Sequence, residues 1–341
     1  YQMFYDKLEK ANYFLESVIK TAEEPLDGRL VNFLLQNPMQ DGGQWDMFAA
    51  LVEKYGCVPK YVMPETYHSS ATADMVRLLT VKLREDALIL RAEAGDRQAL
   101  KEKMLGEIYR MLSICLGTPP EKFDFEYRDK DKNFHRDAGL TPREFYEKYV
   151  GQAIDDYVSI INAPTKDKPY GKTYTVDYLG NVAGGRAVKY LNLPNEELKA
   201  LAIAQLKDGA PVWFGCDVGK MHMRKRGIMG MRAFDYEKLL NVSFGMDKAQ
   251  RLDTGESMLT HAMVFLGVNL DECGKPNRWK VENSWSDERG QEGYYIMTDE
   301  WFDQYNYQVV VNKKYMTDEQ RAAYDQEPFV LKPWDPMGSL A

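Results

Sequence analysis

Long apolar runs and an excess of basic residues are both missing from this 341-residue sequence, and each absence excludes a class of protein. No uninterrupted apolar run reaches the roughly 18 residues that span a bilayer, and the first residues lack the charged and apolar regions of a signal peptide. We therefore expect a soluble protein without a membrane partner. The 52 aspartates and glutamates outnumber the 44 lysines and arginines, which gives a net charge of −8. This acidic balance argues against nucleic acid as the main partner.

Cysteine and histidine are scarce, with four residues of each type. Cys57, Cys115, Cys216 and Cys273 form no CxxC pair and have no regular spacing, so the sequence predicts no metal site. A reducing compartment is the simpler interpretation, and we expect the protein in the cytoplasm. The chain begins at Tyr1, without an initiator methionine and already within an amphipathic pattern. We expect that its natural beginning is missing.

Helical periodicity is typical of the first half of the chain. Residues 5–22 carry apolar side chains at helical spacing, and a second helix is predicted at 45–55. From residue 69 to about residue 158 the sequence is charged and helical, with two apolar stripes that indicate a packed core or a subunit interface. Within this region, Thr141–Glu144 is a capping box that starts a further helix. Residues 166–172 are predicted to form a surface loop.

Strand patterns are typical of the last third of the chain. The run from Ala210 to Val218 is almost continuously apolar, as expected for a strand that is buried on both faces. Burial raises the pKa of a thiol, so Cys216 in this run is predicted to be an inert core residue. Further strand patterns at 259–268, 279–285, 293–297 and 307–311 predict an antiparallel sheet or an open barrel.

One histidine and one asparagine lie on two of these strands. Alternation places His261 on a face with Met263 and Phe265, and it places Asn283 on the apolar face of the next strand. A hairpin would bring the two side chains together. The amide oxygen would then orient the imidazole, which could take a proton from a nucleophile. The other interpretation is that both are core polar groups with satisfied hydrogen bonds.

Two adjacent glycines, Gly42 and Gly43, precede the helix predicted at 45–55. Paired glycines allow another backbone to approach closely, so their main chain could bind an extended peptide through strand-like hydrogen bonds. The alternative is a turn that requires positive φ.

Several motifs carry a resemblance that extends through essentially the whole chain. Thr260-His261-Ala262, Glu282-Asn283-Ser284-Trp285 with Gly293-Tyr294, and Asp41-Gly42-Gly43-Gln44-Trp45 occur in the order found in the papain-like cysteine peptidases. The segments DTGES at 253–257, WFGCDVG at 213–219, EYRDKDK at 126–132 and WDPMG at 334–338 are more specifically similar to the bleomycin hydrolase family, known in bacteria as aminopeptidase C. So many long motifs in register argue against chance similarity.

The resemblance implies an α+β protein with the papain-like cysteine peptidase fold. In that fold a helical domain is joined to an antiparallel β-barrel-like domain, here with a helical insertion. We expect residues 1–68 to be the remaining part of the helical domain and residues 69–206 to be the insertion, which mediates oligomerisation. Residues 207–328 would form the β-rich domain that carries the histidine and the asparagine. Residues 329–341 would form a C-terminal arm that enters the cleft.

The resemblance also implies roles for the residues that match the family's motifs. His261 would be the general base and later the general acid, and Asn283 would orient its ring. Trp285 would shield the hydrogen bond between them from water. Gly42 and Gly43 would lie along the substrate backbone in the cleft.

The implied activity is that of a cysteine aminopeptidase, which removes N-terminal residues from unblocked peptides through a thioester and needs no metal or organic cofactor. The terminal carboxylate, here that of Ala341, would meet the free amino group of the substrate and so exclude internal cleavage; the alternative is a frayed tail. The family is also known as a homohexamer. Some of its members bind nucleic acid through a basic channel, a property that the acidic balance argues against.

The family's nucleophilic cysteine lies on a helix near the N-terminus, and no segment of these 341 residues matches that helix. None of the four cysteines lies in a comparable motif, so we expect the nucleophile outside this chain. Two alternatives remain. One is a catalytically inactive oligomer that binds peptides or nucleic acid, and the other is a different hydrolase in which His261 works with Asp253 or Glu256.

Overall fold

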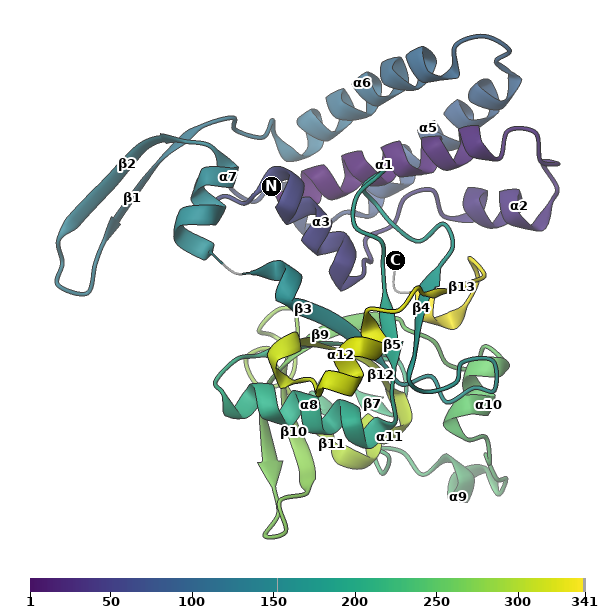
Figure 1. Cartoon of the computed structure of the whole chain (residues 1–341), viewed down its shortest axis with the longest axis vertical. Coiled ribbons are helices and arrows are strands. Elements are labelled where there is room, and N and C mark those ends of the chain that lie inside the picture. Colours follow the sequence, from purple (N-terminus) through teal and green to yellow (C-terminus); the bar gives the residue numbers. More distant parts are fainter. Residues whose placement is uncertain (152, 340–341) are drawn as a thin grey trace. The chain divides into compact units, whose positions relative to one another are not determined.

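The computed structural model describes residues 1–151 and 153–339 (Figure 1). These residues divide by their packing into two compact units. The first unit contains Tyr1–Ile154 and Tyr178–Val188, and the second contains Asp155–Asp177 and the described residues from Lys189 to Ser339. None of the helices in the described part of the chain combines the length and the hydropathy of a membrane span.

The first unit is mainly helical. Its helices are α1 (Gln2–Lys20), α2 (Arg29–Gln36), α3 (Trp45–Tyr55), α4 (Tyr67–Ser70), α5 (Ala73–Ala92), α6 (Arg97–Leu116) and α7 (Pro142–Phe145), and its strands are β1 (Phe123–Arg128) and β2 (Phe134–Leu140). The apolar faces of α1, α5 and α6 pack together and bury Leu15, Leu83 and Ile108 completely. Burial of these stripes stabilises the long helices, because a helix alone in water is only marginally stable.

Local signals set the ends of these helices. The Asp96 carboxylate accepts hydrogen bonds from the N–H groups of Gln98 and Ala99, each at 3.0 Å, and so starts α6. Gly56 ends α3 with a φ of +68°, which glycine adopts without strain. The helices predicted at 5–22 and 45–55 are confirmed, as is the capping box at Thr141–Glu144.

The prediction of helix throughout 69–158 is wrong at residues 123–140, which form the antiparallel β1–β2 hairpin. Aromatic and charged residues alternate along β1, and across the strands the Tyr127 ring stacks on His135 at 4.8 Å. The Asp129 carboxylate accepts two main-chain N–H groups of the turn, each at 2.9 Å. This local hydrogen bonding closes the turn and competes with helix formation.

The second unit is built on one sheet. Its strands are β3 (Tyr157–Ile161), β4 (Lys172–Val176), β5 (Tyr190–Asn192), β6 (Val212–Cys216), β7 (His222–Met223), β8 (Ile228–Met229), β9 (His261–Leu270), β10 (Pro276–Glu282), β11 (Tyr294–Thr298), β12 (Asn306–Asn312) and β13 (Phe329–Leu331). Its helices are α8 (Asn195–Lys207), α9 (Tyr236–Leu240), α10 (Lys248–Asp253), α11 (Asp299–Tyr305) and α12 (Asp318–Tyr324). The strand order is β13-β4-β5-β3-β12-β6-β9-β10-β11-β8-β7.

Strand direction in this sheet is mixed. Most neighbouring strands are antiparallel, as the sequence predicts, but β13–β4, β3–β5 and β11–β8 are parallel. The chain between the members of each parallel pair is long enough to return to the same end of the sheet. Alternation along a single strand carries no information about this direction, so the sequence did not predict these three parallel pairs.

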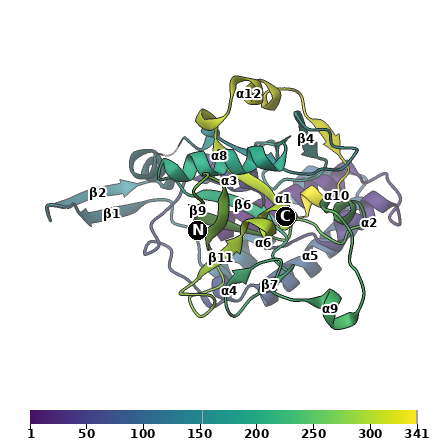
Figure 2. The same cartoon turned by 90° about the horizontal axis from the view of Figure 1, so that it is seen from below.

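An aromatic core holds the central strands together. Phe265 of β9 stacks on Phe214 of β6 with ring centroids 3.8 Å apart, and it lies 4.9 Å from Trp279 of β10. Trp279 also stacks on Phe302 of α11 at 4.9 Å. Helix α8 packs against β12, β9 and β6. Figure 2 shows α8 beside β9 and β6. The core therefore fixes β6, β9 and β10 side by side.

The packing divides the chain at residues other than the expected domain boundaries. Residues 155–177 and 189–206, expected within the helical insertion, pack in the second unit as β3, β4, β5 and α8. Their apolar side chains, such as Ile160 and Leu191, belong to the buried core of the sheet. The functional division at residues 68, 206 and 328 stays a prediction.

Candidate active site

A histidine and an asparagine meet at the open end of the β9–β10 hairpin. His261 is the first residue of β9, and Asn283 directly follows the last residue of β10, which pairs antiparallel with β9. His261 Nε2 lies 2.9 Å from Asn283 Oδ1. Because an amide oxygen only accepts hydrogen bonds, Nε2 carries the proton and Nδ1 of the neutral ring stays unprotonated. The hairpin expected from the sequence thus brings the two side chains together.

The indole of Trp285 packs against this pair. Its ring centroid lies 4.6 Å from that of the His261 imidazole, and the guanidinium groups of Arg224 and Arg289 each lie 5.7 Å from the indole. A hydrogen bond beside an apolar ring is stronger than one in water, because the local dielectric constant is lower. Spacing along the chain gives no sign that the Arg224 guanidinium lies over Trp285.

A second histidine packs near the first and is absent from our sequence-based predictions. His222 of β7 is buried, and its Nδ1–H donates to the Val218 carbonyl at 3.0 Å. Its ring centroid lies 6.1 Å from that of Trp285 and 5.4 Å from that of Tyr295. The Trp285 indole therefore contacts two imidazoles, and only one of them is bonded to Asn283.

Both imidazoles have a lowered pKa in the folded chain. For His261, burial lowers the pKa and outweighs the hydrogen bond to Asn283, which acts in the opposite direction. For His222, burial lowers the pKa against the opposing Val218 carbonyl, and the charges of Arg224 and His261 lower it further. Removal from water disfavours the charged imidazolium, so burial favours the neutral form of both rings.

These lowered pKa values predict that acid destabilises the fold. An unfolded histidine has a pKa of about 6.5. As the pH falls through this value, His222 and His261 therefore bind more protons in the unfolded chain than in the folded chain. The free energy of unfolding should be highest above about pH 7 and should decrease as the pH falls through about 6.5. Urea unfolding at a series of pH values measures this decrease.

A phenylalanine at position 222 separates the contribution of His222 from the rest. His222→Phe keeps a ring beside Trp285 but does not titrate, so its stability should depend less on pH than that of the wild type. His135→Phe, at an exposed position on the β1–β2 hairpin, is the control. Equal pH dependence in His222→Phe and the wild type would contradict the prediction.

A buried carboxylate supports the segment before His261. Asp217 directly follows β6 and accepts hydrogen bonds from Ser257 Oγ at 2.8 Å and from Thr260 Oγ1 at 3.3 Å. Ser257 Oγ in turn accepts one from Tyr307 Oη at 2.7 Å. Thr260 immediately precedes His261, so this network fixes the start of β9. Its members are far apart along the chain, and the sequence analysis missed them for that reason.

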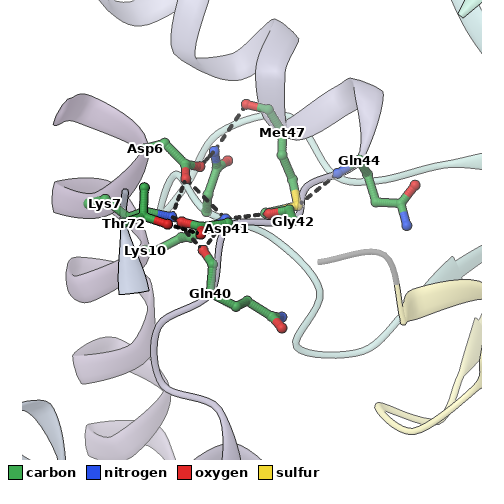
Figure 3. A network of polar contacts seen from close by, with 10 residues as sticks. Asp6, Lys7, Lys10, Gln40, Asp41, Gly42, Gln44, Met47 and Thr72 are labelled. Carbon is green, nitrogen blue, oxygen red and sulfur yellow. Dashed lines mark hydrogen bonds and ion pairs between the residues drawn. The ribbon is translucent and has the colours of Figure 1, made fainter. Parts of the chain in front are cut away.

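In the first unit, two buried lysines of α1 hold the loop that contains the paired glycines (Figure 3). Lys7 Nζ donates to the Gln40 carbonyl at 2.6 Å, and Lys10 Nζ donates to the Gln40 carbonyl at 3.0 Å and to the Gly42 carbonyl. Neither Gly42 nor Gly43 is among the described residues that have a positive φ. The hypothesis of a positive-φ turn is therefore wrong. A Cβ atom at Gly43 would meet no atom of the described residues within 4 Å, so these residues leave the space beside it open.

Carboxylates neutralise these two lysines. Lys7 pairs with Asp41 at 2.8 Å and Lys10 pairs with Asp6 at 3.0 Å (Figure 3). Burial lowers the pKa of Lys10, and the charge of Asp6 opposes this effect. Ammonium groups form strong hydrogen bonds to carbonyl oxygens, so the pair anchors the loop firmly. This role could not be predicted from the sequence, because lysines on an amphipathic helix usually lie on its solvated face.

The C-terminal arm (residues 329–341) is described as far as Ser339, so the predicted carboxylate of Ala341 lies outside the described residues. Met337 is fully buried, and Ser339 Oγ donates to the Leu259 carbonyl at 2.7 Å. Leu259 lies two residues before His261. As far as Ser339, the arm is therefore packed beside the segment that leads into the histidine, and the alternative of a frayed tail is wrong for this part.

Comparison with known proteins identifies the family of this chain. The sequence model of the Peptidase C1-like family matches residues 1–338. The chain belongs to the Peptidase C1-like family. Its fold is therefore the papain-like peptidase fold of the α+β class, as the sequence analysis predicts.

Members of the Peptidase C1-like family are similar to this chain over its whole length. Aminopeptidase C of Streptococcus thermophilus is 54% identical over 99% of this chain and 77% of its own. Aminopeptidase C of Listeria monocytogenes is 54% identical and human bleomycin hydrolase 47% identical, each over 100% of this chain and 78% of its own. The crystal structure of PepW from Lactobacillus rhamnosis matches with a TM-score of 0.96 at 56% identity, over 100% of this chain and 78% of that chain.

The four cysteines of this family member occupy unlike settings. Cys216 on β6 is fully buried, and burial raises the pKa of its thiol well above the ordinary value, so its assignment as an inert core residue is confirmed. Burial also raises the pKa of Cys57 and of Cys115, which belong to the first unit. Cys273 is exposed in the turn at the closed end of the β9–β10 hairpin, opposite the end with His261. A catalytic thiol needs the opposite shift, toward a lower pKa.

Proposed function

We propose that this chain supplies the histidine and the asparagine of a Cys-His-Asn triad in a cysteine aminopeptidase that removes N-terminal residues from unblocked peptides. Its relatives named aminopeptidase C support a cysteine aminopeptidase. The observation that carries the finer assignment is the 2.9 Å contact between His261 Nε2 and Asn283 Oδ1. This contact fixes the tautomer of the ring and leaves Nδ1 to exchange a proton with a thiol.

In this mechanism His261 transfers a proton in each half of the reaction. It first takes the proton of the thiol, and the resulting thiolate forms an ion pair with the imidazolium. The thiolate attacks the carbonyl carbon of the first peptide bond, and the C–N bond breaks as the imidazolium protonates the leaving amine. Water, deprotonated by His261, then hydrolyses the thioester. Trp285 shields the His261–Asn283 hydrogen bond during both halves.

We place the nucleophile outside these 341 residues. The curated relatives support this placement, because the chain corresponds to only 77–78% of their length. The alternative in which His261 works with Asp253 or Glu256 has less support. Glu256 pairs with Lys220 at 2.7 Å, and the imidazole is bonded to the amide of Asn283.

Alkylation of an active preparation tests this proposal. Iodoacetamide should abolish hydrolysis of a fluorogenic aminoacyl amide, and peptide mapping should find the alkylated cysteine outside residues 1–341. Resistance to alkylation would overturn the cysteine mechanism. Inactivation through one of the four cysteines of this chain would overturn the placement of the nucleophile. Equal cleavage of the N-acetylated substrate would overturn the assignment as an aminopeptidase.

We further propose that Gly43 forms the main-chain hydrogen bonds to the substrate. The Gly42 carbonyl already accepts a hydrogen bond from Lys10. The main chain of Gly43 makes no hydrogen bond to any described residue, and the space beside it is open. A free N–H and a free carbonyl are what an extended peptide needs in order to pair as a strand.

Lys10→Met should therefore weaken substrate binding in the active enzyme. The variant removes the donor to the Gly42 carbonyl and leaves the loop less constrained, so we expect KM to rise about tenfold with little change in kcat. Steady-state kinetics on a dipeptide amide measures both constants. The control is Lys20→Met, at an exposed position on the same helix. An unchanged KM in Lys10→Met would show that this loop does not position the substrate.

The C-terminal arm would restrict this enzyme to exopeptidase action. In this proposal the carboxylate of Ala341 pairs with the ammonium group of the substrate, a charge-assisted contact that a blocked or internal residue cannot make. The position of Ser339 supports the proposal, since its hydroxyl is bonded to the Leu259 carbonyl two residues before His261.

Assembly into a homohexamer in the cytoplasm is also part of the proposal, with peptide substrates as partners and without nucleic acid or membrane. Segment 234–246 supports self-association. It exposes seven large apolar side chains: Phe234, Tyr236, Leu239, Leu240, Val242, Phe244 and Met246. Exposed apolar patches of this kind mark protein interfaces. Sedimentation velocity measures the assembly directly.

A further inference from the structure

The C-terminal arm is held by side chains that no proposed catalytic role explains. Asp335 starts the short helical turn Pro336–Gly338, and its Oδ1 accepts a hydrogen bond from the Met337 N–H at 2.9 Å. The Met337 carbonyl accepts a hydrogen bond from the buried Tyr190 hydroxyl at 3.0 Å. Asp335 is thus the point at which the arm turns toward the segment before His261.

The other oxygen of Asp335 forms a buried ion pair. Lys168 Nζ lies 2.9 Å from Asp335 Oδ2, and the two side chains are only 6% and 10% exposed. Lys168 also contacts Asp167 at 3.0 Å. Burial lowers the pKa of Lys168, but the charges of Asp335 and Asp167 outweigh it, so the net shift is upward and the ammonium stays charged. The sequence analysis predicted a surface loop at 166–172, and for Lys168 that prediction is wrong because of this pairing.

Lys168 is itself firmly attached to the sheet. The side-chain amide of Asn192, a fully buried residue of β5, donates to the Lys168 carbonyl at 2.7 Å and to the Ala163 carbonyl at 3.0 Å. Its oxygen accepts the Ala163 N–H at 2.9 Å. The ammonium group therefore projects from a loop whose main chain is bonded to the interior of the sheet.

We propose that the Lys168–Asp335 pair, here called the clamp, fixes the register of the C-terminal arm relative to His261 and so determines the ratio of exopeptidase to endopeptidase action. This inference rests on the proposed role of the arm. A slip of one residue along an extended chain moves its end by about 3.3–3.6 Å. A carboxylate binds an ammonium group within only about 2.7–2.9 Å, so one such slip breaks the contact to the substrate.

The geometry explains why an ion pair serves this purpose better than the other contacts of the arm. The hydroxyl contacts of Tyr190 and Ser339 go to main-chain carbonyls, which recur at every residue and can be exchanged after a slip. The carboxylate of Asp335 occurs once in this turn. A slipped arm would leave the buried ammonium of Lys168 with the exposed Asp167 carboxylate but without the buried Asp335 carboxylate. Loss of the buried partner of a buried charge is disfavoured.

Two variants test the clamp in the active enzyme. Lys168→Met removes the ammonium group. Asp335→Asn removes the charge of the carboxylate but keeps an oxygen that can accept the Met337 N–H. For both variants we expect the rate on an N-acetylated peptide, relative to the same peptide with a free amine, to rise about 10- to 100-fold. Lys166→Met, at an exposed position in the same loop, is the matched control and should leave this ratio unchanged.

A second measurement needs no catalytic activity. Carboxypeptidase Y removes residues one by one from the C-terminus, and mass spectrometry identifies the last residue that remains. In the wild type and in Lys166→Met, Gly338 should remain attached to the chain. In Lys168→Met and Asp335→Asn, digestion should proceed through Met337. Thermal unfolding checks that the variants are folded, and if Lys168→Met fails to fold, Asp335→Asn carries the test.

The outcomes separate the clamp from the proposed function. If both clamp variants keep the wild-type substrate ratio and the wild-type resistance to digestion, the clamp is overturned. If the wild-type enzyme cleaves blocked and free peptides equally, the exopeptidase role of the arm is wrong. The digestion experiment still decides in that case whether Lys168 and Asp335 hold the arm.

Discussion

His261→Ala is expected to lower kcat of the active enzyme by about 10⁴-fold or more while the fold stays intact. In the proposed mechanism the imidazole takes the proton of the thiol and later protonates the leaving amine, so without it both halves of the reaction lose their proton carrier. The side chain is only partly buried at the end of β9, so its removal leaves the core unchanged. Steady-state hydrolysis of a fluorogenic aminoacyl amide measures the loss, and thermal unfolding confirms the fold.

Asn283→Ala provides the comparison for this variant. It keeps the imidazole but removes the 2.9 Å contact that orients the ring, so we expect a smaller loss of about 10²-fold. A His261→Ala variant with more than about 1% of wild-type kcat would contradict the role of general base. If Asn283→Ala lost nothing, the tautomer of His261 would be set by another group.

Phe265→Ala should have the largest effect on stability. The Phe265 ring is fully buried and stacks on Phe214 at 3.8 Å, with Trp279 at 4.9 Å. Removal of a buried ring loses its transfer free energy and leaves a cavity, so we expect the free energy of unfolding to fall by about 3–5 kcal/mol. Domains are stable by only about 5–15 kcal/mol, so this is a large part of the total. Urea unfolding of both proteins measures the difference.

Leu266→Ala is the matched control, because Leu266 follows Phe265 on the same strand and is 38% exposed. We expect it to cost less than about 1 kcal/mol. A cost below about 1.5 kcal/mol for Phe265→Ala would mean that the strands repack around the missing ring. In that case, packing in this aromatic core would not be what holds β9 in place.

The sequence predicted those features of the fold that depend on short-range patterns. Helices α1 and α3 and the strands β9 and β10 follow from apolar periodicity within each element. The β1–β2 hairpin was missed because its turn depends on the side-chain bonds of Asp129, and the parallel strand pairs were missed because pairing is a long-range property. Lys168 was assigned to a surface loop, because its partner Asp335 is 167 residues away along the chain.

In the candidate site, too, short-range patterns predicted some residues, and long-range contacts determine the others. Alternation alone placed His261 and Asn283 on apolar faces, and a hairpin was enough to bring them together. His222 and Asp217 were not identified as part of the site. Their surroundings come from Trp285, Thr260 and other segments that only the folded sheet assembles.

The β9–β10 hairpin separates the His261–Asn283 pair from the turn that joins its strands. The two residues are 22 positions apart in sequence, yet the ladder between the strands keeps them in contact at the open end. Residues added at the exposed tip, between Glu272 and Gly274, would loop into solvent and leave that ladder in register. The tip is therefore a permissive insertion point, where a purification tag or a reporter peptide can be grafted onto the strand of the histidine without disturbing its chemistry.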